Sequence, residues 1–186
     1  MLGDALPEAV AGIDPARLAT TRLVFVAHSI PTVMAEESGP TGGLYVRQLL
    51  TAARAVAAAA PELEWMLAYS SRSGPPHVPW LTPDVNSALR ALASDGVSDV
   101  VVVPIGFVSD HIEVRWDLDV EAAATAAEVG LAFVRTDPPA ADPRFVAMVR
   151  ELVMERVDPT APRRALSDLG PSHDVCPNGC CRAGRS

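Results

Sequence analysis

Four short apolar segments alternate along the chain with four longer segments of helical character, and this alternation limits the fold more than any other feature. The short segments have the length and the β-branched or aromatic content of strands; they are residues 23–27, 65–69, 100–103 and 131–134. The longer segments have helical spacing or helix-capping residues; they are residues 42–60, 83–94, 110–128 and 142–157. Regular alternation of this kind predicts an α/β fold with a parallel sheet.

The third apolar segment indicates how the sheet is covered. Residues 100–103 are all valine, as expected for a strand that is buried on both faces. We therefore predict a Rossmann-like, three-layer domain, residues 21–157, in which helices cover both faces of the sheet. Residues 1–20 are predicted to be a lead-in segment. Residues 158–186, rich in Pro, Gly, Ser and Arg, are predicted to be a mobile tail.

The net charge of −8 excludes one class of partner and admits another. A nucleic-acid surface would need a basic stripe, so we expect no nucleic-acid partner. A cation substrate is compatible, because carboxylate-lined clefts concentrate metal ions. No apolar run approaches the roughly 18 residues of a membrane span, and the first residues lack the pattern of a secretory signal. We therefore expect a cytoplasmic protein without a transmembrane segment.

Three segments follow the first three predicted strands, and each contains residues capable of chemistry. They are His28, the segment 70–80 and the segment 106–113. Loops beyond the carboxyl ends of parallel strands lie at one edge of the sheet, so we expect the three segments to share one rim. His28 by itself fits a structural histidine as well as a functional one. The shared rim favours a proton acceptor or a metal ligand.

The segment 109–113 has two interpretations. Asp110 and Glu113 have the spacing of a capping box, which would make both acids structural. Glu113 also begins a series with Asp117 and Glu121, whose four-residue spacing places three carboxylates on one face of a helix. Like charges at this spacing repel by about 0.2–0.5 kcal/mol per pair. A row of oxygen ligands that tolerates this repulsion is typical of cation handling.

Simpler alternatives exist for the acidic helix and for the loop that precedes it. The helix face is also compatible with a solvated charged surface, on which Asp119 lies within reach of Arg115. The Pro-rich segment 69–80 is either a stiff turn whose Trp80 packs on the core, or the wall of a pocket for a flat apolar ligand.

Three motifs occur in order along the chain. They are Ala27-His28-Ser29-Ile30-Pro31; Ser71-Arg72-Ser73-Gly74 followed by Pro79-Trp80-Leu81; and Pro104-Ile105-Gly106-Phe107-Val108-Ser109-Asp110-His111-Ile112-Glu113 leading to Asp117-Leu118-Asp119. Together they resemble the ferrochelatases, over roughly residues 23–157. Gly42-Gly43-Leu44-Tyr45 is a partial match to the family's Gly-Asp-Pro-Tyr turn, because the acid is missing.

The resemblance implies a lyase that inserts its substrate Fe²⁺ into a porphyrin during haem biosynthesis. His28 would accept pyrrole protons or bind iron, and Glu113 would face it across the porphyrin as the second catalytic and metal-binding group. Asp117 and Glu121 would be outer metal-binding steps. Supporting roles are implied for Asp110 and His111, and porphyrin contacts are implied for Pro31, Ser71 and Trp80.

The resemblance also implies a partner, because family members have two α/β halves with the porphyrin between them. This chain corresponds to the C-terminal half, so we expect either an N-terminal half, which the motifs favour, or a second copy of the chain. The composition is typical of high-GC bacteria, in which the family's substrate is coproporphyrin III rather than protoporphyrin IX. Two alternatives remain: a homodimeric sirohydrochlorin chelatase for Co²⁺ or Ni²⁺, and a non-catalytic metal- or haem-binding module.

All three cysteines, Cys176, Cys180 and Cys181, lie in the predicted tail. Clustered cysteines in a reducing compartment bind metal more often than they form disulfides. These three resemble the C-terminal cluster by which some ferrochelatases, including actinobacterial ones, hold a two-iron, two-sulfur cluster. Such a cluster takes four thiolates, so the resemblance implies a fourth ligand from outside this chain. A Cys₃His zinc site with His173 is the competing interpretation, and a vicinal disulfide is the third.

Overall fold

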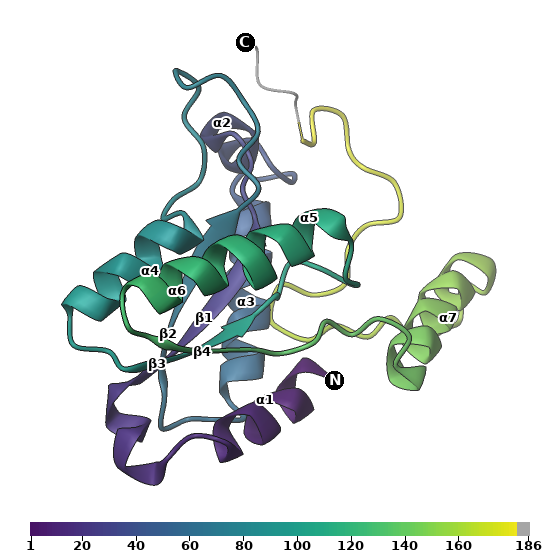
Figure 1. Ribbon diagram of the computed structural model, residues 1–186. Helices are drawn as coiled ribbons and strands as arrows, with labels where there is room; N and C mark the ends of the chain where they lie inside the picture. The colour runs from purple at the N-terminus through teal and green to yellow at the C-terminus, as the bar shows by residue number, and fades with distance from the viewer. Residues whose placement is uncertain (182–186) are drawn as a thin grey trace.

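The computed structural model describes residues 1–181, which contain a sheet of four parallel strands (Figure 1). The strands are β1 (Thr21–His28), β2 (Glu64–Ser70), β3 (Asp99–Val103) and β4 (Ala132–Arg135). Their order across the sheet is β2-β1-β3-β4. Each predicted apolar segment contributes a strand, and the predicted parallel α/β fold is confirmed.

Helices cover both faces of the sheet. One face is covered by α1 (Leu2–Ala11) and α3 (Leu44–Ala57). The other is covered by α4 (Val85–Ser94) and by a continuous helical segment made of α5 (Ile112–Val114), η2 (Arg115–Ala122) and α6 (Ala123–Glu128). Figure 1 shows α4 and α6 side by side over the strands. The predicted three-layer, Rossmann-like arrangement is therefore confirmed.

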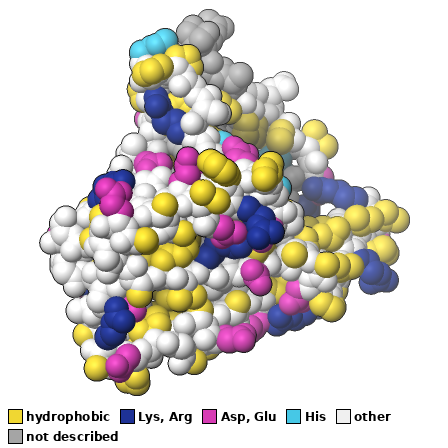
Figure 2. Space-filling model, in the orientation of Figure 1, with side chains coloured by type: hydrophobic (Ala, Val, Ile, Leu, Met, Phe, Trp, Pro, Cys, Tyr) yellow, Lys and Arg dark blue, Asp and Glu magenta, His cyan; other side chains and the backbone are white. Residues whose placement is uncertain are grey.

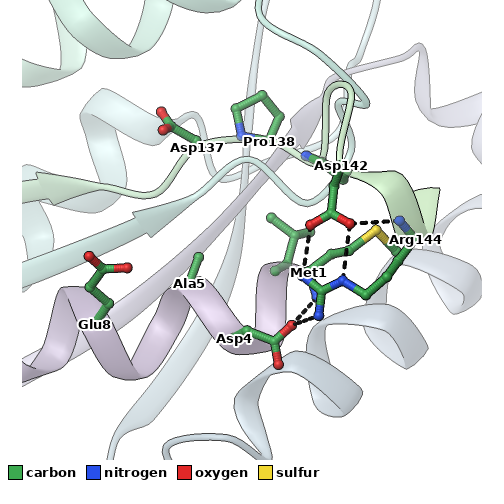
Figure 3. A pocket seen from close by; sticks show the side chains of 10 residues that line it. Met1, Asp4, Ala5, Glu8, Asp137, Pro138, Asp142 and Arg144 are labelled. Atoms are coloured by element: carbon green, nitrogen blue, oxygen red, sulfur yellow. Dashed lines mark hydrogen bonds and ion pairs between the residues drawn. The ribbon is translucent and has the colours of Figure 1, made fainter. Parts of the chain in front are cut away.

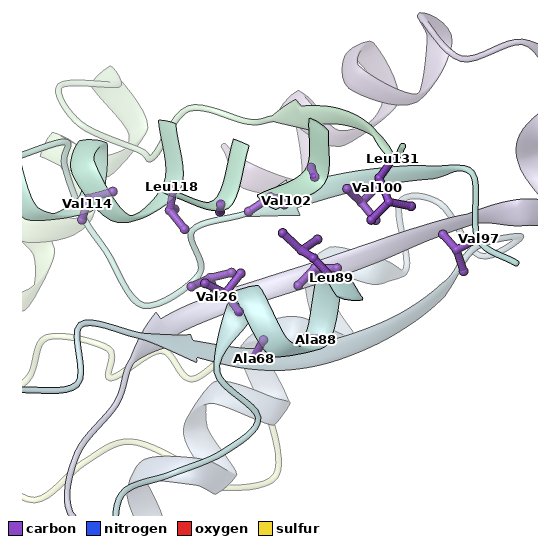
Figure 4. Packing of buried hydrophobic residues seen from close by; sticks show 14 of the residues in the cluster. Val26, Ala68, Ala88, Leu89, Val97, Val100, Val102, Val114, Leu118 and Leu131 are labelled. Carbon is purple, nitrogen blue, oxygen red and sulfur yellow. The ribbon is translucent and has the colours of Figure 1, made fainter. Parts of the chain in front are cut away.

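Alternate residues of the central strands point to opposite faces, so the core has two parts. Val26 and Val102 pack with Leu89 of α4 and Leu118 of η2, and all four side chains are completely buried (Figure 4). Full burial of a Val or Leu side chain contributes about 1.5–3 kcal/mol to stability. This part of the core therefore fixes the helical segment that carries the acidic residues of interest.

The second part of the core includes residues from the start of the chain. Leu23, Phe25 and Val101 pack with Ala53 of α3 and with Leu6 of α1, which is completely buried. A short 3₁₀ helix, η1 (Pro15–Thr20), then leads into β1. The segment predicted as a lead-in thus supplies a helix that packs on the sheet.

Two local features differ from the predicted elements. Helix α4 begins at Val85 rather than at residue 83, because the Asp84 carboxylate accepts hydrogen bonds from the N–H groups of Asn86 and Ser87 (2.9 and 3.3 Å) and so caps the helix there. The short helix α2 (Thr32–Glu36) was not predicted. Its five residues are too few to show helical periodicity.

The last helix, α7 (Pro143–Val157), extends away from the sheet (Figure 1) and contains no buried residue. Asp142 caps it by accepting the Arg144 N–H at 2.8 Å. From Asp158 to Cys181 the chain has no helix or strand, and it returns along α7 through the ion pairs of Arg163 with Glu155 and Arg164 with Glu151. Residues 182–186 of the predicted tail lie outside the described residues. Among the described residues, no helix has the length and apolar character needed to cross a membrane.

Candidate active site

Three connections leave the carboxyl edge of the sheet, and they define the rim: His28 at the end of β1, the segment after Ser70 of β2, and the segment between β3 and α5. Two backbone hydrogen bonds join the first two connections, from Leu81 N–H to the Ile30 carbonyl and from Thr32 N–H to the Pro79 carbonyl, both 3.0 Å. The predicted shared rim is therefore present in the structure.

The rim brings His28 and Glu113 together, with His28 Nε2 3.6 Å from Glu113 Oε1. The other ring nitrogen, Nδ1, makes a short hydrogen bond to the carbonyl oxygen of Ser29. A carbonyl oxygen can only accept, so Nδ1 carries the proton and Nε2 of the neutral ring keeps a free lone pair. Both side chains are partly exposed, at 36% and 46%. The pair is thus oriented and accessible from solvent.

Two residues that we had not singled out hold His28 in place. The Tyr45 hydroxyl donates to the His28 carbonyl at 2.7 Å, and burial raises the pKa of Tyr45, so the hydroxyl remains a neutral donor. Gly106 passes so close to β1 that a Cβ on it would lie 2.7 Å from the Ala27 Cβ. The only signal in the sequence was that both residues belong to the motifs quoted above.

The capping-box interpretation of Asp110 and Glu113 is wrong. The helix begins at Ile112 rather than at residue 110, and its cap residue, His111, makes no side-chain capping bond. Asp110 instead pairs with Arg135 of β4, with the closest nitrogen and oxygen 3.2 Å apart. A structural capping role therefore does not account for Glu113.

The predicted continuous α-helix over 110–128 is also wrong in its middle, because η2 (Arg115–Ala122) is a π-helix. π-Helical turns are rare and occur frequently at functional sites. In η2, the Asp117 carboxylate accepts a short hydrogen bond from the Ser71 hydroxyl. The Glu121 carboxylate accepts from the Trp116 ring N–H at 3.1 Å. The π-helical segment η2 thus contains two of the predicted metal-binding acids.

The structure does not gather His28, Glu113, Asp117 and Glu121 into one compact ligand set. Within the described residues, no three of these four side chains converge as a metal centre would require. His28 and Glu113 form a pair, and Asp117 and Glu121 lie separately further along the helical segment. Asp119 belongs to a different face, where it pairs with Arg115 at 3.4 Å and with Arg135. The expected pairing of Asp119 with Arg115 is therefore present, but Asp119 also contacts Arg135, whose side chain is only 11% exposed, so this face is not fully solvated.

Of the residues predicted to contact a porphyrin, Pro31 and Trp80 lie opposite each other in an isolated antiparallel bridge. A neighbouring pocket of about 440 Å³ is lined in part by Trp80, Ser29 and Arg72. The buried Trp80 Nε1 has no hydrogen-bond partner among the described residues. Pro31, Ser71, His28 and Glu113 do not line this pocket. Among the described residues, the His28–Glu113 pair therefore lies at the rim outside this pocket, with both side chains partly exposed.

His111, the second predicted supporting residue, is exposed and lies edge-on to Phe107, with ring centroids 6.0 Å apart. This contact does not test the predicted supporting role, which stays a prediction.

A separate polar pocket of about 270 Å³ lies between α1 and the start of α7 (Figure 3). Arg144 bridges Asp4 of α1 and Asp142, and its hydrogen bonds lower the pKa of Asp142. None of the rim residues lines this pocket. Its ion pairs are exposed, and exposed pairs contribute little to stability, so we interpret it as a docking contact for the first turn of α7.

The tail brings together the donor atoms of His173, Cys176 and Cys180, all within 4.8 Å of one another. Cys181 Sγ lies 3.6 Å from Cys180 Sγ, well beyond the roughly 2.05 Å of a disulfide bond. The vicinal disulfide, the third interpretation of the cysteines, is therefore absent, and all three thiols are free. A two-iron, two-sulfur cluster takes four protein ligands divided between two irons. Within the described residues the converging donors are two thiols and one imidazole, fewer than the four ligands that such a cluster takes.

Known proteins share both the motifs and the extent of this domain. The sequence profile of the ferrochelatase family matches residues 2–157. The coproporphyrin III ferrochelatase of Streptomyces griseus is 49% identical over 179 residues, covering 89% of this chain and 48% of the relative. That of Frankia alni is 52% identical, covering 86% and 42%, and that of Nocardia farcinica is 47% identical, covering 96% and 53%.

The chain thus spans about half the length of the curated relatives it matches. A solved CbiX-type protein connected with cobalamin (vitamin B12) biosynthesis, from Marinobacter aquaeolei VT8, covers 75% of this chain at 18% identity with a TM-score of 0.47, values too low to bear on function. The profile match and the identities of about one half are decisive: the chain belongs to the ferrochelatase family.

Proposed function

We propose that this chain carries the metal-handling half of an enzyme that inserts Fe²⁺ into coproporphyrin III during haem biosynthesis. The observation that carries the proposal is the His28–Glu113 pair at the rim, with Nε2 and Oε1 3.6 Å apart. The names of the relatives support iron as the metal and coproporphyrin III as the porphyrin. They favour this function over a sirohydrochlorin chelatase and over a non-catalytic module.

Metal insertion requires two protons to leave the pyrrole nitrogens as the iron arrives. His28 suits proton acceptance, because the Ser29 carbonyl holds the Nδ1 proton and leaves the Nε2 lone pair free. The Glu113 carboxylate, 3.6 Å from Nε2, then lies beside the positive charge that proton acceptance creates and attracts it. Imidazole and carboxylate are also suitable ligands for Fe²⁺, so the same pair fits delivery of the metal.

Asp117 and Glu121 are proposed as outer steps by which hydrated Fe²⁺ approaches Glu113. Each accepts a hydrogen bond from a neighbour, Ser71 or Trp116, and retains further acceptor positions on its carboxylate. Separate carboxylates suit transfer better than a closed cage, because a cation held by one carboxylate at a time is not trapped. Water ligands are lost one by one along such a path.

Pro31, Ser71 and Trp80 are proposed to contact the porphyrin. Pro31 and Trp80 form one wall beside His28, and a flat macrocycle matches the apolar surface that such a wall presents. Val33 and Met34 of α2 extend the apolar surface next to Pro31, each with 44% of its area exposed. Ser71 connects this wall to Asp117 and so fixes the porphyrin contacts relative to the iron path.

A second α/β half is proposed to cover the porphyrin on the side opposite this chain, because the relatives are about twice as long as this chain. The exposed helix α7 supports this assignment. Val146, Val149, Val153 and Val157 lie along one side of it with 43–70% of their areas exposed, and Figure 2 shows hydrophobic side chains gathered over this helix at the right of the molecule. A surface of this kind marks an interaction site.

The function is tested by iron insertion into coproporphyrin III in the complete two-half enzyme. We expect His28→Ala and Glu113→Ala each to abolish turnover, while Glu128→Gln, an exposed acid at the end of α6 that pairs with Arg90, keeps it. Near-normal turnover of either rim variant would overturn the assignment. The need for a second α/β half is tested separately on this chain alone. We expect it to be inactive in iron insertion and monomeric by sedimentation. An active dimer would instead favour a second copy of the chain as the partner.

A further inference from the structure

Arg135 is the last residue of the edge strand β4, and its side chain is only 11% exposed. Its guanidinium contacts two carboxylates of the segment that carries Glu113. Nη1 and Nη2 donate to the two oxygens of Asp110, both at 3.2 Å. Nε and Nη2 donate to the two oxygens of Asp119, and Nη1 also donates to the Thr136 carbonyl at 3.3 Å. A guanidinium has five N–H groups, so these contacts use its whole donor set.

The two carboxylates lie on either side of the metal-handling part of the segment. Asp110 precedes Glu113 and Asp117 in the sequence, and Asp119 follows them. The helical segment begins at Ile112, and its cap residue makes no side-chain capping bond. A helix start without such a cap takes its direction from other contacts. Here Asp110 is attached to β4 just before the helix begins, and Asp119 is attached to β4 within η2.

Glu113 has few contacts of its own. Among the described residues its carboxylate pairs only with His28, and its side chain is 46% exposed. Its position is therefore set by the backbone that carries it. Val114 and Leu118 anchor this backbone to the core, but apolar contacts are non-directional. Paired N–H···O bonds between a guanidinium and a carboxylate fix orientation as well as distance.

We propose that Arg135 is a positioning residue for the metal insertion proposed at this site. It acts through Asp110 and Asp119, whose attachment to β4 sets the place of Glu113. The Glu113 carboxylate is thereby kept opposite His28. This inference rests on the function proposed above. It requires the fork shape of the guanidinium and not its charge alone, because a lysine ammonium has three donors on one nitrogen and cannot make paired bonds to two carboxylates at once.

Iron insertion into coproporphyrin III by the complete two-half enzyme tests the proposal. We expect Arg135→Gln to lower kcat about 10–100-fold, since a displacement of about 1 Å caused by a distant substitution can cost about 100-fold. The Kd of the porphyrin, measured by absorption titration, should remain unchanged. Arg135→Lys should recover little of the lost turnover. An unchanged kcat in Arg135→Gln, or full turnover in Arg135→Lys, would overturn the proposal.

Arg17→Gln is the matched control for a loss of stability alone. Arg17 also joins a buried carboxylate of the sheet, with its Nε 2.9 Å from Oδ2 of Asp99. Asp99 begins β3, at the edge of the sheet opposite the rim. We expect Arg17→Gln to lower the free energy of unfolding, measured by urea denaturation, and to leave kcat unchanged. An equal loss of kcat in Arg17→Gln and Arg135→Gln would contradict a specific positioning role.

Asp119→Asn provides a second variant if Arg135→Gln does not fold, because it weakens one pair and leaves the Asp110 pair in place. We expect a smaller loss of kcat than in Arg135→Gln, again with unchanged porphyrin Kd. Unchanged turnover in Asp119→Asn would show that Asp119 transmits nothing to Glu113 and would count against the proposal.

Amide hydrogen exchange in the complete enzyme gives a readout that does not depend on turnover. We expect Arg135→Gln to speed exchange across residues 112–119 and to leave β1 unchanged. Unchanged exchange across 112–119 would show that Arg135 does not hold the segment. Normal turnover in Glu113→Ala would instead remove the proposed function itself, whatever the exchange rates show, so the two failures can be told apart.

Discussion

The rim and the tail each bring together candidate metal ligands, but the two regions are held in place by opposite means. At the rim, His28 ends a strand whose five preceding residues are completely buried. The helical segment that contains Glu113 is anchored to the core by Val114 and Leu118, which are also completely buried. In the tail, His173, Cys176 and Cys181 are exposed and no helix or strand surrounds them. The rim is organised by the core, and the tail is held by polar contacts.

The two sites therefore obtain their geometry from different sources. A site that acts on a substrate benefits from side chains held in position before the substrate arrives, because ordering them later costs free energy. A structural metal site has no such need, since the metal's own binding free energy orders its ligands. We therefore expect core substitutions to damage the rim and to leave the tail site unchanged.

The largest effect is expected for Leu118→Ala, which removes the buried side chain beneath η2. The cavity should lower the free energy of unfolding by about 2–5 kcal/mol, measured by urea denaturation. Val120→Ala is the matched control two residues away. Its side chain is 46% exposed, so we expect a change within about 0.5 kcal/mol. Similar losses in the two variants would contradict the claim that the core fixes this helix.

A smaller effect is expected for Gly106→Ala, which tests how closely the third connection must approach β1. The new Cβ would lie 2.7 Å from the Ala27 Cβ and 2.8 Å from its Cα, so the backbone must shift next to His28. We expect a loss of about 1–3 kcal/mol of stability, measured by thermal denaturation, together with slower iron insertion in the complete enzyme.

Gly3→Ala is the control for this substitution, because a Cβ there meets nothing within 4 Å. Unchanged stability and turnover in Gly106→Ala would show that the connection has room to move, and would weaken the contrast between a rigid rim and an adaptable tail.

The features that the sequence predicted are those that one segment determines by itself. The valine run of β3 and the apolar run of β1 indicate buried strands wherever they occur, and parallel strands place the residues that follow them at one edge. His28 and Glu113 could therefore be assigned to a common rim before any coordinates were known. Their roles came from the resemblance of the motifs to a family rather than from the chemistry of isolated residues.

The features that were missed depend on contacts between distant segments. The π-helical turn of η2 leaves no mark in a four-residue spacing of acids, which fits an α-helix equally well. Asp110 has the spacing of a cap but pairs with Arg135, 25 positions later. The bond of Ser71 to Asp117 joins residues 46 positions apart. Sequence spacing describes neighbours on one helix, and it carries no information on partners supplied by another strand.

The smallest effect is expected for Cys181→Ala, which removes the Sγ that accepts the Gly39 N–H. One such hydrogen bond contributes about 0.5–1.5 kcal/mol at most, so we expect a loss of stability no larger than this. Thermal denaturation of the variant and of the unchanged chain measures the difference. A loss as large as that of Leu118→Ala would mean that the tail unfolds together with the core, and the two regions would then be one cooperative unit.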